Sequence, residues 1–248
     1  MGKIIALGGG EIGRPGTKVE TMSIDKEIIK LSGKKNPLLL FIPTASGDSE
    51  SYYEVVKKHF GVRLKCRTDV LYLIKEKNSK EDIRKKILKA DIIYVGGGNT
   101  LKMMKVWRKL GLDKILEEAY KNNIVLSGIS AGAICWFKYG NSDSLVFSNK
   151  NAGMIRVKGL DFVDGLFCPH YDIEKKRKSE LKRVMKNTKG FALALDNCMA
   201  IEIVDDKFRF ISSKSTANAY ITHWENGKYI ETVIKKKPFS PVSTLFVQ

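Results

Sequence analysis

The stretch Ile124-Val-Leu-Ser-Gly-Ile-Ser-Ala-Gly-Ala133 holds the feature on which the fold prediction rests. Residues 124–126 form an apolar run that is typical of a strand buried on both faces. Gly128 and Gly132 flank Ser130, and a helical sequence follows at once. A buried strand that passes through a tight turn directly into a helix is the building unit of α/β proteins with a parallel sheet.

The same alternation of strands and helices precedes this stretch. We expect helices between the strands, with Ser23, then Asp48 or Ser49, then Ser79 as N-caps. Gly33 and Gly61 are placed to end the first two helices, and a break near Gly111 separates two helices that follow Thr100. Apolar runs predict the earlier strands at residues 4–7, 38–42, 91–95 and somewhere within 62–74.

The chain changes character after Phe191. Asn226-Gly227 is a hairpin turn signal between two further strand-like runs. These runs are residues 220–224 and 228–233, and shorter strands are expected at 191–195, 200–204 and 207–212. No linker separates this part from the rest, so we predict one α/β domain over residues 1–248. Its expected architecture is a doubly wound, mostly parallel sheet with helices on both faces, plus C-terminal β-hairpin elements.

The composition is that of a globular protein, with 43% hydrophobic and 29% charged residues among 248. No apolar run reaches eighteen residues, and the N-terminus lacks the pattern of a signal peptide. The four cysteines form no C-x-x-C pair, which favours reduced thiols over a disulfide framework or a zinc site. We therefore expect a cytoplasmic protein that binds no membrane and no metal.

A formal net charge of +17 raises the possibility of nucleic-acid binding. The lysines, however, fall on expected helix faces at residues 75–89 and 174–189, without the interleaved aromatic residues that single-strand binding uses. A lysine-rich surface is the better interpretation, and we expect no nucleic-acid partner. Attraction of small acidic substrates by this surface stays open, as does the choice between monomer and homodimer.

Residues Gly128-Ile-Ser130-Ala-Gly132 match the nucleophile elbow G-x-S-x-G. Glycines are needed two residues either side, because a serine in so tight a strand-to-helix turn leaves no room for side chains there. The turn holds the Ser130 hydroxyl out of the sheet, and the Ala131 N–H points to where an oxyanion develops. An incidental glycine turn is the alternative, but the placement between strand and helix favours a nucleophile.

The turn Gly96-Gly-Gly-Asn-Thr100 follows the neighbouring strand. Three glycines let the backbone approach a ligand and present N–H groups to an anion. Beside Ser130 we expect this turn to supply a second oxyanion donor. In a nucleotide-binding protein the same turn would bind phosphate, and a turn that only ends the strand would have the same sequence. We expect Gly98 and Asn99 to contact the substrate.

The first loop also carries a glycine motif, since Gly8, Gly10 and Gly13 spell G-x-G-x-x-G. Arg14-Pro15-Gly16 interrupts the helix that should bind the pyrophosphate of a dinucleotide. We therefore expect no dinucleotide and no other cofactor.

A nucleophilic serine needs a base, and the chain has three histidines to offer. His170 lies where an apolar run stops at Pro169 and a polar loop begins, which suits a base at a strand end. His59 and His223 have simpler roles at a helix end and in the expected hairpin. The carboxylate that orients the base is open between Asp143 and its rivals Asp164, Asp172 and Glu174.

The chain resembles the dipeptidase E and cyanophycinase family of serine peptidases, whose fold is similar to that of class I glutamine amidotransferases. The resemblance rests on Phe41-Ile-Pro-Thr-Ala-Ser46, Val95-Gly-Gly-Gly-Asn-Thr100, Gly128-Ile-Ser-Ala-Gly-Ala133 and Cys168-Pro-His170, in the order of the family. It implies Ser130 as nucleophile, His170 as base, Asp143 as third member, and Ala131 and Gly97 as oxyanion donors. The loop reads Asn141-Ser-Asp143, a departure from the adjacent Asn-Asp pair of dipeptidase E.

The resemblance implies a serine peptidase that hydrolyses small peptides through an acyl-enzyme. Dipeptidase E cleaves dipeptides with N-terminal aspartate, whereas cyanophycinases cleave β-linked aspartyl-arginine; no substrate motif in this chain favours either. Two other functions stay open: a non-catalytic ligand-binding or regulatory protein on the same fold, and an amidotransferase-like amidase. Cys135 lies too far into the helix to replace Ser130 as the nucleophile of such an amidase.

Overall fold

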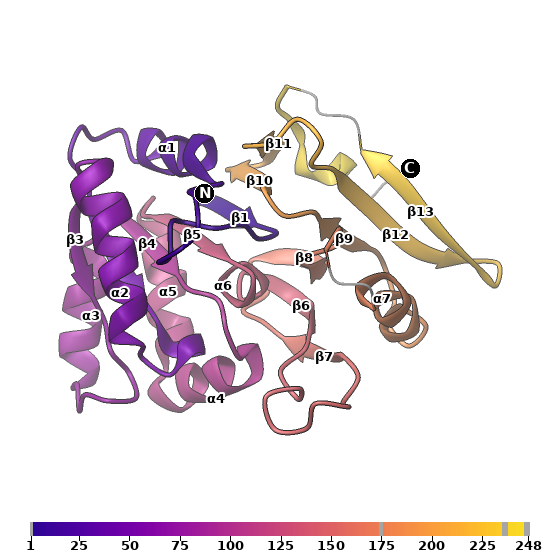
Figure 1. Cartoon of the computed structure of the whole chain (residues 1–248), viewed down its shortest axis with the longest axis horizontal. Helices are drawn as coiled ribbons and strands as arrows, with labels where there is room; N and C mark the ends of the chain where they lie inside the picture. Colours follow the sequence, from indigo (N-terminus) through magenta and orange to yellow (C-terminus); the bar gives the residue numbers. More distant parts are fainter. Residues whose placement is uncertain (1, 174–175, 235–237, 246–248) are drawn as a thin grey trace.

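Two β-sheets lie beside one another in the protein (Figure 1). The coordinates are a computed structural model that describes residues 2–173, 176–234 and 238–245. The first sheet has eight strands in the order β14-β11-β10-β1-β5-β4-β2-β3, and the second has six in the order β13-β12-β9-β8-β6-β7.

The first sheet is parallel over its five N-terminal strands. Each neighbouring pair from β1 to β3 runs in the same direction, and β10 then joins β1 antiparallel. The parallel strands are β1 (Lys3–Leu7), β5 (Val125–Ile129), β4 (Ile92–Val95), β2 (Leu38–Ile42) and β3 (Arg67–Val70). The antiparallel extension consists of β10 (Met199–Val204), β11 (Lys207–Ser212) and β14 (Ser240–Pro241). The predicted parallel strands are thus confirmed, and so is the α/β class.

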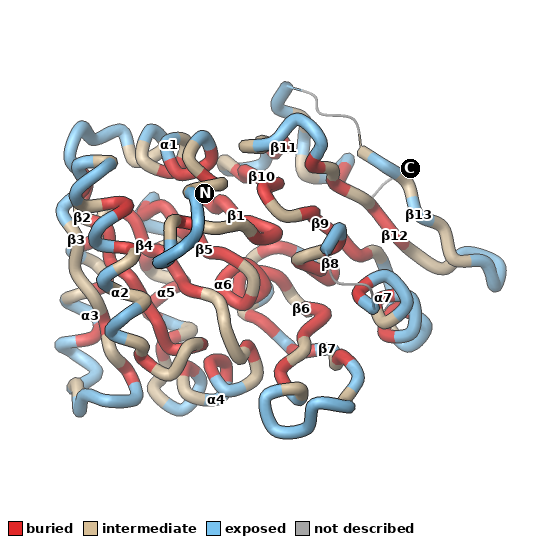
Figure 2. The backbone as a smooth tube through the Cα atoms, in the orientation of Figure 1, coloured by how far each residue is buried: buried red, intermediate tan, exposed pale blue. Residues whose placement is uncertain are grey.

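Helices cover both faces of this sheet because its strands are apolar on both sides. Leu39 and Phe41 of β2 pack against α1 (Met22–Leu31) and α2 (Glu50–Val56). Leu40 and Ile42, which point the other way, pack in a core with three more helices. These are α3 (Lys80–Lys89), α4 (Thr100–Leu110) and α5 (Leu112–Lys121). Figure 2 shows the result as buried central strands inside exposed helix surfaces.

The second sheet was not predicted as a separate unit. Its strands are β13 (Lys228–Ile234), β12 (Ala219–Glu225), β9 (Ala192–Leu195), β8 (Val163–Cys168), β6 (Phe137–Ser142) and β7 (Ile155–Lys158). Strands β12 and β13 form the predicted hairpin across Asn226-Gly227 and project away from the first sheet (Figure 1). Leu181 and Met185 of α7 (Arg177–Met185) pack on one face of this sheet.

Two predicted helix ends need correction. Ser23 is not the N-cap of α1; Thr21 holds that position, and the Ser23 hydroxyl donates to the carbonyl of Ser212. Gly61 does not end the second helix, because the chain continues past α2 as a π-helix over Lys57–Arg63. Ser49 and Ser79 do cap their helices, accepting the N–H groups of Tyr52 and Asp82.

The two sheets meet at the carboxyl ends of their parallel strands. The His170 N–H donates to the carbonyl of Gly8 (3.0 Å) just beyond β1, and the Tyr171 N–H donates to Leu195 at the end of β9 (3.1 Å). Loops from both sheets therefore converge on one region, the edge where open parallel sheets bind ligands. Among the described residues, no helix is long and apolar enough to cross a bilayer.

Candidate active site

Ser130 lies in a strained turn between β5 and α6 (Ala131–Ile134). Its φ of 55° and ψ of −113° are unfavourable for a residue with a side chain. A Cβ on Gly128 would lie 2.2 Å from the carbonyl oxygen of Gly132, and one on Gly132 would lie 2.1 Å from that of Val95. Both glycines are therefore required sterically, as the elbow pattern predicts.

His170 reaches Ser130 from the second sheet. It follows β8, and its φ of 55° turns the chain back over the site. The ring Nε2 lies 2.9 Å from the Ser130 Oγ, close enough to accept the hydroxyl proton. The structure thus brings together the two residues that the sequence proposes as nucleophile and base.

Asn197 occupies the position at which a third group orients the imidazole. Its Oδ1 lies 2.7 Å from Nδ1 of His170. Because an amide oxygen only accepts, Nδ1 carries the proton, which leaves a lone pair on Nε2 for Ser130. The Asn197 backbone N–H donates to Oδ1 of Asp172 at 2.8 Å, which holds the start of this turn.

Asp143, the expected third member, does not make this contact with Nδ1. Asp143 follows β6, where its carbonyl accepts the N–H of Val146 at 2.8 Å, and the contact with Nδ1 is made by Asn197 instead. Asp164 is exposed and paired with Lys138 at 3.1 Å. Asp172 acts one step away, through the Asn197 backbone, and Glu174 lies outside the described residues.

The first glycine-rich loop supports this hydrogen-bonded chain. A Cβ on Gly9 would lie 2.4 Å from Nδ1 of His170 and 2.0 Å from Oδ1 of Asn197. The carbonyls of Gly8 and Gly9 accept the N–H groups of His170 and Cys198. The glycines thus let the loop pack directly behind the imidazole, which explains the motif without a nucleotide.

The backbones of Ala131 and Gly97, the two expected oxyanion donors, both lie beside Ser130. Ala131 is the first residue of α6, so no preceding helical turn supplies an acceptor for its N–H. A Cβ on Gly97 would lie 3.5 Å from Cβ of Ser130, which puts this backbone directly beside the nucleophile. The Gly97 N–H donates to the hydroxyl of Tyr52 at 3.4 Å, and burial raises the pKa of that phenol.

Gly98 and Asn99 differ in what they face. Gly98 lines the cavity in front of Ser130 and has a φ of 137°, and a Cβ there would lie 2.3 Å from the carbonyl oxygen of Ala45. The Asn99 side chain instead caps α4, accepting the Lys102 N–H at 2.9 Å and donating to the Ser144 carbonyl at 3.0 Å. Asn99 therefore ties the glycine turn to the loop after β6, a structural role that the sequence did not indicate.

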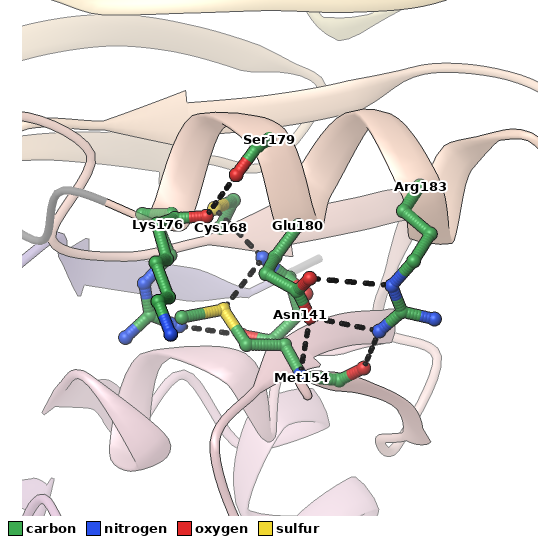
Figure 3. Close-up of polar contacts among 8 residues, drawn as sticks. Asn141, Met154, Cys168, Lys176, Ser179, Glu180 and Arg183 are labelled. Atoms are coloured by element: carbon green, nitrogen blue, oxygen red, sulfur yellow. Dashed lines mark hydrogen bonds and ion pairs between the residues drawn. The ribbon is translucent and has the colours of Figure 1, made fainter. Parts of the chain in front are cut away.

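That loop is anchored at its other end by a polar cluster under α7 (Figure 3). The Glu180 carboxylate accepts the Met154 N–H at 2.6 Å, and Arg183 donates both to Glu180 and to the Met154 carbonyl. The hydrogen bond from Arg183 lowers the pKa of Glu180. Glu180 and Arg183 thus fix the chain immediately before β7.

A cavity of about 1340 Å³ opens in front of Ser130 and His170. Its walls come from the loop over residues 10–19, from α2 with the π-helix, and from Gly97 and Gly98. In the ranges that the structure describes, no group of three or more His, Cys, Asp or Glu side chains is placed to hold a metal ion.

Known proteins resemble this chain in sequence. The sequence matches peptidase family S51 over residues 4–211. It is 40% identical to the uncharacterized peptidase YgaJ of Bacillus subtilis (strain 168) over 225 residues, covering 89% of this chain and 91% of that protein.

Solved structures share the fold. A peptidase from an acI-B1 Actinobacterium superposes with a TM-score of 0.72 at 19% identity, covering 97% of both chains. A protein of Listeria monocytogenes EGD-e that is named for peptidase E has a TM-score of 0.64 at 22% identity, covering 86% of this chain and 98% of its own. The resemblance seen in the sequence is confirmed: the chain belongs to peptidase family S51, and it is a peptidase.

Proposed function

We propose that this peptidase is of the serine type and hydrolyses small peptides through an acyl-enzyme on Ser130. The observation that carries the proposal is the continuous hydrogen-bonded chain from Ser130 Oγ through both nitrogens of His170 to Asn197. Its geometry suits a nucleophile, its base and an orienting group, in the proton arrangement that the reaction needs.

In the proposed first step, Ser130 Oγ attacks the peptide carbonyl while His170 Nε2 takes the hydroxyl proton. The N–H groups of Ala131 and Gly97 donate to the oxyanion of the tetrahedral intermediate. The imidazolium then protonates the leaving amine as the C–N bond breaks. Water attacks the resulting ester with His170 again as base, which releases the acid and restores Ser130.

The cavity supports a small substrate with an acidic group. Its volume of about 1340 Å³ holds a short peptide, and four cationic side chains line it against two acidic ones. A β-aspartyl linkage, as in a cyanophycinase-like peptidase, fits the same chemistry as an α-linked aspartyl dipeptide. We include a cytoplasmic location in the proposal, supported by four cysteines that are all buried and reduced.

Hydrolysis of a dipeptide library with α- and β-aspartyl members by the wild type and Ser130→Ala tests the proposal. We expect the wild type to cleave a subset and Ser130→Ala to lose turnover while it keeps its melting temperature. Equal turnover by the pure variant contradicts the mechanism. A wild type that binds peptides and cleaves none of them supports the non-catalytic alternative.

A further inference from the structure

The wall of the cavity carries positive charge without local compensation. Lys18, Lys58 and Arg63 line the cavity and form no ion pair with any described residue. The two acidic residues of the wall are neutralised separately, Glu11 by Arg14 and Glu54 by Lys57. Three cations therefore face the space that the substrate enters.

Arg63 differs from the two lysines because its guanidinium is held in place. Its Nη1 donates to Nδ1 of His59 at 2.9 Å. Since arginine can only donate, Nδ1 must be the acceptor, and the proton of His59 lies on Nε2. That nitrogen is 2.8 Å from Oδ2 of Asp25, which therefore accepts from it.

The pair behind Arg63 is buried at a considerable energetic cost. His59 is 1% exposed and Asp25 is not exposed at all. Burial raises the pKa of Asp25 against the opposing hydrogen bonds from His59 and Thr21, and Asp25 Oδ1 has no hydrogen-bond partner among the described residues. Replacing a buried charged pair by apolar side chains of similar size commonly leaves a protein at least as stable. Packing alone therefore does not account for His59 and Asp25 at these positions.

The backbone that carries His59 and Arg63 is also unusual. Both residues lie in the π-helix Lys57–Arg63, a geometry that is uncommon and concentrated at functional sites. The two side chains are in contact across four residues, and the guanidinium lies beside Gly13 of the cavity loop, where a Cβ would lie 3.8 Å from Nη1.

We propose that Arg63 binds a carboxylate of the substrate and that the buried His59–Asp25 pair is its positioning device. One N–H of the guanidinium is used by His59, and the others are available to form the paired hydrogen bonds that arginine makes with carboxylates. The inference rests on the proposed peptidase function for its substrate. The carboxylate is either the C-terminus of the peptide or an acidic side chain.

The test compares two substrate pairs, one that differs only in a C-terminal carboxylate or carboxamide, the other only in aspartate or asparagine. We expect Arg63→Gln to raise KM about 10- to 100-fold for the acid member of one pair, with a much smaller change in kcat. The substrate pair whose two members Arg63→Gln no longer distinguishes identifies which carboxylate is bound. Unchanged discrimination in both pairs overturns the proposal. Lys65→Gln, which removes an exposed charge just after the π-helix and outside the cavity, is the control.

The positioning role is tested at His59. Gln can accept from Arg63 and donate to Asp25, so His59→Gln should retain discrimination, whereas His59→Leu should lose it as Arg63→Gln does. Retained discrimination in a folded His59→Leu variant contradicts the positioning role. If that variant does not fold, His59→Asn, whose amide is too short to reach both Arg63 and Asp25, replaces it: loss of discrimination in His59→Asn together with its retention in His59→Gln supports the positioning role, and normal KM values in His59→Asn contradict it.

Binding measurements separate this inference from the proposed function. Calorimetric titration of the same peptides into Ser130→Ala and Ser130→Ala/Arg63→Gln needs no turnover. Weaker binding of the acid peptide by the double variant supports the Arg63 site even if the wild type hydrolyses nothing. Equal binding by both proteins contradicts the site even if the wild type is an active peptidase.

Discussion

His170 Nδ1 lies 2.7 Å from Oδ1 of Asn197, so an amide oxygen accepts the Nδ1 proton and holds the imidazole next to Ser130. A neutral partner fixes the tautomer and the ring but adds no negative charge to stabilise the imidazolium that forms during the reaction.

Two replacements of Asn197 should have different effects, one on kcat and the other on the pH dependence of kcat/KM. Asn197→Ala removes the group that fixes the tautomer, and we expect kcat to fall about 10²-fold with little change in KM. Asn197→Asp restores a charge beside the imidazole and should move the pH profile of kcat/KM toward higher pH, because the protonated ring is stabilised. Steady-state kinetics from pH 5 to 9 measure both. An Asn197→Ala variant with wild-type kcat contradicts the orienting role.

Tyr52 affects the oxyanion site through its contact with Gly97. The phenol accepts the Gly97 N–H, and because burial raises its pKa it stays protonated at neutral pH and can donate to the oxyanion. We expect Tyr52→Phe to lower kcat about 10- to 100-fold with KM nearly constant. An unchanged or higher kcat would mean that the hydroxyl only occupies the amide in the free enzyme.

Gly9 should tolerate no side chain. A Cβ there would lie 2.4 Å from the imidazole and 2.0 Å from the Asn197 oxygen, so alanine has to displace one of them. We expect Gly9→Ala to reduce kcat at least tenfold, since small displacements of positioned groups are costly to catalysis. The fractional loss of kcat should exceed the fraction of unfolded protein that circular dichroism measures. A kcat loss that only follows unfolding argues against this packing role.

Glu180 gives a pH-dependent contribution to stability. The Arg183 hydrogen bond lowers the pKa of Glu180 in the folded state, so the stabilisation is complete above the unfolded pKa of about 4.3 and is lost as pH falls through the folded value. We expect Glu180→Gln to lower the melting temperature by about 2–4 °C at pH 7. The difference from wild type should disappear in strong acid.

The matched control is Glu81→Gln, which breaks an exposed pair with Lys85 on α3. Exposed pairs of this kind contribute about 0–1 kcal/mol, so its melting temperature should change less. A constant difference between Glu180→Gln and the wild type at all pH values contradicts the assignment to the carboxylate charge.

The sequence predicted the first sheet well because its strands are buried on both faces. Runs such as Leu38–Ile42 are continuously apolar, and few other structures accommodate them. Strands of the second sheet are less distinctive: β6 contains Lys138, Asn141 and Ser142, and it pairs with β8, more than twenty residues away in the sequence. Such pairing depends on tertiary contacts that no local pattern encodes.

The candidate site was predictable as far as it lay in local motifs. Ser130 and His170 were found because a glycine elbow and a strand end are visible in the sequence, whereas Asn197 lies 27 residues after His170 without any motif. One signal was present: Asn197 follows the strand at Ala192–Leu195, and the carboxyl ends of parallel strands meet at one edge. The preference for a charged third group directed attention to Asp143 instead.

The central claim is that Ser130 is a nucleophile activated by His170. Intact-mass spectrometry after reaction with a fluorophosphonate probe tests this claim most directly, with the wild type, Ser130→Ala and His170→Ala compared under the same conditions. We predict one adduct on the wild type, located at Ser130 by peptide mapping, none on Ser130→Ala, and much slower labelling of His170→Ala. An unlabelled wild type, or a label that persists in Ser130→Ala, would contradict the account.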